Sequence, residues 1–156
     1  MPNYIEWLVL AGLAERNEVQ GLHENIIREI EKKYDITLPT TYRDFLMQCG
    51  RGAGLFGRDI DILYPNFLGL DGEFNEVATE FGIDYKPPRN AFFFSAYQGG
   101  SFHFFVCEED DPEIYVLNDG DKEPKLASTK FTLFVKDAIS SYQDAFYAEP
   151  DKHWMA

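Results

Sequence analysis

The stretch Ile26–Gly50, which reads IIREIEKKYDITLPTTYRDFLMQCG, decides the fold of this chain. Its first half repeats apolar side chains at the spacing of one helix face, opposite a charged face: Ile26, Ile27, Ile30 and Tyr34. Its second half repeats them at i, i+3, i+4 and i+7: Tyr42, Phe45, Leu46 and Cys49. Pro39 stands where a first helical residue would fall, and Gly50 stands at the position of a left-handed C-cap. The stretch therefore predicts two amphipathic helices whose apolar faces must be buried.

The aromatic-rich second half of the chain predicts the surface on which these helices pack. Apolar runs predict four strands, at 56–64, 90–97, 101–107 and 113–118. They also predict a helix at 72–81, which Gly82 would end. Short turns join the last three strands, so we expect an antiparallel meander. A closing helix with Thr129 as N-cap is predicted to bury Phe131, Phe134, Val135, Ala138, Tyr142 and Phe146. The predicted fold class is α+β, an antiparallel sheet of about four to six strands with helices packed mainly on one side.

The length of 156 residues predicts a single domain, 1–156, with a substantial core. Apolar positions between Tyr4 and Glu15 predict a short helix, so we interpret residues 1–20 as an added N-terminal helix. Residues 148–156 are interpreted as a tail. No basic segment precedes the first apolar run, and no run approaches the roughly 20 residues of a membrane span. We therefore expect a cytoplasmic chain without a signal peptide.

The charge of the chain limits its partners. There are 27 Asp and Glu residues against 14 Lys and Arg, which gives a formal net charge of −13. Nucleic acids and anionic membranes both require a cationic protein surface, so neither is an expected partner. The same charge would attract a basic protein. The alternative is a cytosolic protein whose acids serve solubility alone.

The residues that could carry catalysis form no recognisable pattern. Cys49 and Cys107 have neither a disulfide framework nor metal-ligand spacing. His103, the one histidine on a predicted core strand, could form a nucleophile–base pair with a nearby thiol or with Ser101, but no motif supports this, and a partly buried core histidine is favoured. The glycine-rich segment 50–57 lacks the Gly-Lys-Ser/Thr of a phosphate-binding loop. We predict no catalytic, cofactor-binding or metal-binding residue, and hence no enzyme.

The acidic residues gather at predicted turns and are the candidate partner-binding residues. The nine candidates are Asp59, Asp61, Glu108, Glu109, Asp110, Asp111, Glu113, Asp119 and Asp121. Three further acids surround the start of the helix at 72–81: Asp71, Glu73 and Glu76. Because a meander places its turns close together, we expect the candidates to share one acidic face. The alternative interpretation is solvated turn residues that keep the sheet edges from pairing with other chains.

The organising stretch also resembles the opening signature of the SUKH superfamily, IE..Y.I.LP..Y..FL...G. The matching residues are Ile30, Glu31, Tyr34, Ile36, Leu38, Pro39, Tyr42, Phe45, Leu46 and Gly50. The order of the later elements is similar too: a glycine-rich turn, Phe-rich strands, an acidic turn and a closing helix that begins at a phenylalanine. The resemblance covers roughly residues 22–147 by this coarse reading of the elements.

This superfamily includes yeast cell-wall assembly regulators (Smi/Knr-like) and many bacterial immunity proteins. The resemblance implies a non-catalytic protein that binds and neutralises a cognate polymorphic toxin. It implies a protein partner, a basic toxin domain in particular. A scaffold or regulatory module related to the cell-wall assembly regulators is the alternative, although that branch typically carries long disordered flanks.

Overall fold

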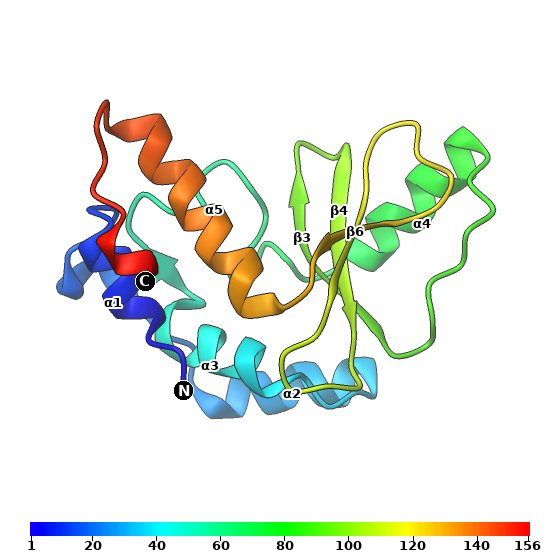
Figure 1. The fold of residues 1–156 in the computed structure, drawn as a ribbon. Helices are drawn as coiled ribbons and strands as arrows, with labels where there is room; N and C mark the ends of the chain where they lie inside the picture. The colour runs from blue at the N-terminus through cyan, green and yellow to red at the C-terminus, as the bar shows by residue number, and fades with distance from the viewer.

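A four-stranded antiparallel sheet forms the centre of the molecule, in a computed structural model that describes residues 1–156 (Figure 1). Its strands, in spatial and sequence order, are β3 (Ala91–Tyr97), β4 (Ser101–Val106), β5 (Ile114–Leu117) and β6 (Lys125–Ser128). Each strand pairs with the next along the chain, which confirms the predicted meander. β6 is an additional strand that the sequence pattern does not predict, because its side chains are mostly exposed.

The helices are divided unevenly between the two faces of this sheet (Figure 1). They are α1 (Tyr4–Leu10), α2 (Glu24–Tyr34), α3 (Thr40–Cys49), α4 (Leu70–Phe81) and α5 (Phe131–Phe146). Tyr42 of α3 and Phe131 of α5 contact Phe94 on one face. Phe74 of α4 stacks on Phe93 on the other face. The α+β class, with helices mainly on one side, is therefore confirmed.

Helices α2 and α3 form from the two amphipathic segments of the organising stretch, but their ends differ from the prediction. Pro39 precedes α3 as its N-cap residue instead of beginning the helix. Gly50 is right-handed, with φ −64°, so it is not a left-handed cap. A Cβ atom there would lie 2.7 Å from the Leu46 Cα, and this close approach explains the glycine. The left-handed C-cap belongs to α2, at Asp35 with φ 53°.

The strand predicted at 56–64 is wrong, because this segment forms turns. Its one ladder contact is a bridge in which the Asp61 N–H donates to the Ala96 carbonyl at 2.8 Å, with the reverse bond at 3.1 Å. Gly57, with φ 82°, reverses the chain and ends any alternation. Phe56 is nevertheless fully buried, as predicted. The apolar residues of this segment are buried because they pack against other parts of the fold, although the segment is not a strand.

The N-terminal segment contributes to the common core. The helix in this region is α1, in which Tyr4 and Leu8 are both buried. The next segment adds the 3-10 helix η1 (Arg16–Glu18) and β1 (Val19–Gln20), which pairs antiparallel with β2 (Gly52–Ala53). Residues 1–20 are thus packed against the glycine-rich segment and are not a separate appendage.

The C-terminal segment also returns to the core, which corrects the interpretation of 148–156 as a tail. A second 3-10 helix, η2 (His153–Met155), places Trp154 against α5 with only 7% of its surface exposed. The Trp154 indole N–H donates to the Gln143 Oε1 atom at 3.2 Å. A tryptophan with this hydrogen bond satisfied is suited to burial.

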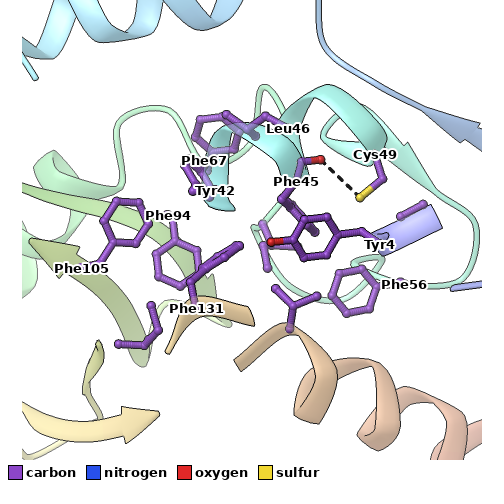
Figure 2. Packing of buried hydrophobic residues seen from close by; sticks show 14 of the residues in the cluster. Tyr4, Tyr42, Phe45, Leu46, Cys49, Phe56, Phe67, Phe94, Phe105 and Phe131 are labelled. Carbon is purple, nitrogen blue, oxygen red and sulfur yellow. Dashed lines mark hydrogen bonds between the residues drawn. The ribbon is translucent and has the colours of Figure 1, made fainter. Parts of the chain in front are cut away.

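Tyr42 contacts more of the buried aromatic rings than its neighbours along α3 do, and Figure 2 shows several of these rings packed together. The Tyr42 ring is fully buried, and its centroid lies 5.1–6.4 Å from those of six others: Phe45, Phe67, Phe92, Phe94, Phe105 and Phe131. Most of these pairs are edge-to-face or tilted, which is the arrangement that aromatic rings favour. The Tyr42 hydroxyl has no hydrogen-bond partner in the protein, so Tyr42 is held by its ring alone.

Removing the Phe45 ring, which stacks on Tyr42, tests how much this cluster contributes to stability. Phe45→Ala is expected to lower the free energy of unfolding by roughly 3–5 kcal/mol, because Phe45 is only 1% exposed and would leave a cavity. Tyr42→Phe is the matched control, since it keeps the ring and removes only the unpaired hydroxyl; it should leave stability unchanged or raise it by about 1 kcal/mol. Urea denaturation measures both. An unchanged midpoint for Phe45→Ala would contradict the assignment of α3 to the core.

Candidate partner-binding surface

The nine candidate acids do not form one face, which corrects the expectation drawn from the meander. The turn at 107–113 joins β4 to β5, and the turn at 118–124 joins β5 to β6. Consecutive turns of a meander lie at opposite ends of the sheet, and a four-residue strand such as β5 separates them by about 13 Å. Figure 1 shows the first turn beside α2 and α3 and the second at the far end.

Two acids of the first turn serve as helix caps. The Asp110 carbonyl accepts the Thr41 N–H at 3.0 Å, and the Asp110 carboxylate accepts the Thr40 hydroxyl at 2.8 Å. The Asp111 carboxylate accepts both the N–H and the hydroxyl of Thr132, at 3.0 and 2.7 Å. Neither α3 nor α5 has a side-chain cap of its own, and the predicted cap Thr129 lies outside α5. The Asp110 carbonyl and the Asp111 carboxylate therefore each satisfy one otherwise unpaired N–H group at the start of a helix.

The remaining candidates differ in how free they are. Four accept a hydrogen bond: Asp59 from Tyr142, Glu108 from Asn90, Glu113 from Tyr115, and Asp121 from the Asn118 N–H. The Asn118 N–H and the neighbouring Lys125 ammonium lower the pKa of Asp121, so this acid is committed to its own turn. Asp61 holds the bridge to β3. Glu109 and Asp119 are exposed and make neither ion pair nor hydrogen bond, which leaves them fully available to a partner.

The residues considered for catalysis are set in apolar surroundings. The His103 ring lies 5.0 Å from that of Phe134, its Nδ1 atom has no partner, and burial lowers its pKa to about 4. Burial raises the pKa of the Cys107 thiol to about 12 and raises that of Cys49 further, so both thiols stay protonated at neutral pH. The Cys49 thiol donates to the Phe45 carbonyl at 3.4 Å (Figure 2). No group of three or more His, Cys, Asp or Glu side chains is placed to hold a metal ion.

The structure gathers a further set of free acids along α4 and its exit, which the candidate list omits. Its members are exposed and make no ion pair: Asp71, Glu73, Glu76, Glu80 and Asp84. A signal for them was present in the sequence, because no Lys or Arg occurs between Arg58 and Lys86. Helix α4 therefore presents a row of carboxylates whose charge no Lys or Arg of the chain neutralises, on the face of the sheet opposite α3 and α5.

An apolar cleft of about 310 Å³ lies beside this helix, at the end of the sheet that carries the second turn. Its apolar lining comes from α4 and its exit and from two strands: Phe74, Val77, Phe81, Ile83, Phe102 and Leu117. Asp119 and Gly120 of the second turn form the opposite rim. Phe81 is 65% exposed, the largest exposed fraction of any Phe, Tyr or Trp in the molecule. The cleft therefore combines accessible apolar surface with free carboxylates.

The α2–α3 pair and the meander are the elements behind the resemblance to the SUKH superfamily, and comparison with known families confirms it. The model of the SMI1 / KNR4 family (SUKH-1) matches residues 21–137, from just before α2 into α5. The chain belongs to this family. The family includes toxin immunity proteins and regulators, which are generally non-catalytic. No curated protein matches the chain. None of its helices has the length and apolar character needed to span a membrane.

Removing the Asp111 cap of α5 should destabilise the fold. Asp111→Ala deletes the acceptor for two groups of Thr132 and is expected to lower the free energy of unfolding by about 1–2 kcal/mol. Glu109→Ala in the same turn is the control and should change it by less than about 0.5 kcal/mol. Urea denaturation compares the two. Equal stabilities would mean that the capping bonds contribute nothing.

The partly buried His103 should make the stability of the fold depend on pH. The folded pKa of His103 is about 4, below the unfolded value of 6.5, so the unfolded chain binds the proton first. The neutral His103 therefore adds to the free energy of unfolding in full above pH 6.5. As the pH falls towards 4 this addition should be lost, which lowers the free energy of unfolding by at most about 3 kcal/mol. His103→Phe should remove that part of the decline and leave the carboxylate contributions in place. Denaturation of both proteins across this range tests it, and a difference that is constant with pH would contradict it.

Proposed function

We propose that this chain is a non-catalytic immunity protein that binds and neutralises a cognate bacterial polymorphic toxin in the cytoplasm. The observation that carries the proposal is the surplus of negative charge that the fold leaves unpaired. Six acids form ion pairs with Lys or Arg: Glu6, Glu24, Glu31, Asp35, Asp121 and Asp144. The other 21 of the 27 acids carry charge that no Lys or Arg of the chain neutralises.

Such a surface fits a cationic protein partner. Complementary charge raises the rate of encounter and selects against partners of the same sign. A toxin that acts on nucleic acid needs a cationic surface to hold phosphates, so an acidic protein can occupy that surface and exclude the substrate. Membership of a family that includes toxin immunity proteins supports this class of partner. The apolar settings of His103 and of both thiols favour binding over catalysis.

The test uses the toxin domain encoded beside this chain's gene. Co-expression should restore growth to cells that produce the toxin, and the two proteins should purify together. Raising the salt from about 50 to about 500 mM should slow association at least about tenfold and change dissociation less, because exposed charges are screened over a few ångströms at high salt. Association that ignores salt would contradict the electrostatic argument. Binding without protection would favour the regulatory class instead.

A further inference from the structure

Helix α4 packs on the sheet most closely through its first half. Phe74, in that half, is 1% exposed and packs against both Phe93 and Phe102, with ring centroids 5.0 and 5.7 Å apart. In the second half Val77 is only partly buried and Phe81 is mostly exposed. Figure 1 shows α4 diverging from the sheet towards its C-terminus. The apolar cleft occupies the wedge that this divergence opens.

The divergence leaves the ring of Phe81 without a role in the fold. Phe81 is the last residue of α4. The helix stops there because Gly82 takes a left-handed conformation, with φ 65°, so the Phe81 ring is not needed for the stop. An exposed aromatic beside an apolar cavity is typical of a residue that anchors an interface. Phe102 and Leu117 at the floor of the same cleft are 2% exposed and give a partner side chain a firm surface.

The charges around the cleft select its occupant. Glu73 and Glu80 lie four residues before and three after Val77, so both neighbour this cleft-lining residue on the helix surface. Asp119 stands exposed on the opposite rim, and Lys122 is the one basic residue that lines the cleft. A second copy of this chain would bring another −13 of net charge and be repelled. Complementarity instead requires a cationic segment.

We propose that the cleft between α4 and the second turn is the docking site for the toxin, through a segment that places Lys or Arg around one large apolar side chain. The apolar side chain enters the cleft against Phe81, and the cations meet Glu73 and Glu80 on one rim and Asp119 on the other. The inference rests on the proposed function and assigns its surface and the chemistry of its partner. The acids of the 107–113 turn then act only at long range.

The first experiment needs no toxin. A synthetic peptide with one Trp flanked by two Lys or Arg on each side is titrated into labelled protein and followed by NMR. The backbone amide shifts should concentrate at 77–83 and 117–122. A peptide with Ala for Trp should bind at least about tenfold more weakly, and one with Glu for the cations should not bind. Shifts that concentrate at 107–113, or equal binding by the Ala peptide, would overturn the proposal.

The second experiment uses the toxin and compares two double variants of equal charge change. Glu73→Lys/Glu80→Lys should weaken binding at least about tenfold, and Phe81→Ala should do the same on its own. Glu108→Lys/Glu109→Lys, at the other end of the sheet, should change it less than about threefold. The four glutamates and Phe81 are exposed, so we expect each variant to keep the melting transition of the wild type. Measuring that transition first confirms that each variant is folded.

The outcomes separate the two proposals. A wild-type protein that neither binds nor protects against the toxin overturns the proposed function, while the peptide titration still reports on the cleft. A wild type that binds, with cleft variants that bind equally well or with both charge reversals equally harmful, overturns the docking site alone.

Discussion

The packing around the Tyr42 ring is the interaction on which the rest of the structure depends. Its neighbours come from four separate parts of the chain: α3 itself, the segment before α4, the strands β3 and β4, and α5. Each of these elements is short or two-faced and cannot bury its aromatic side chains alone. The ring of Tyr42 gives them a common contact, and its unpaired hydroxyl is tolerated because the ring buries so much apolar surface. This is why the organising stretch, rather than the longer α5, fixes the arrangement.

A polar connection at the edge of this cluster joins the starts of α3 and α5 to the turn after β4. The turn after β4 presents Asp110 and Asp111 to the starts of α3 and α5, neither of which supplies its own cap. The Thr41 carbonyl also accepts the hydroxyl of Tyr4, so α1 is attached at the same point. Acidity in this turn is therefore partly a requirement of the fold. An acid that caps a helix keeps its negative charge, but its carboxylate is already hydrogen-bonded and is less free to contact a partner directly.

The sequence predicts well where burial is local and poorly where it is not. The stripes of α2 and α3 and the runs of β3 and β4 appear in the sequence because one face of each is buried throughout. Strand β6 leaves no such trace, since it is a strand only because β5 offers it an edge to pair with. The cap of Thr132 by Asp111 spans 21 residues, so no local pattern encodes it. The placement of the two acidic turns at opposite ends of the sheet follows from the predicted meander itself, so the geometry of an antiparallel sheet was sufficient to predict it.

Apolar surface and charge are distributed so that folding and binding use different parts of the molecule. The face towards α3 and α5 is closed by aromatic contacts, and its nearest acids are engaged as caps. The face towards α4 is covered by half a helix, and the acids there are unpaired. Stability depends mainly on the first set of contacts, because the second half of α4 adds only the partly buried Val77 and Ala78 to the core. That half can present an exposed ring and free carboxylates without weakening the fold, which is the condition that a surface specialised for a cationic partner must meet.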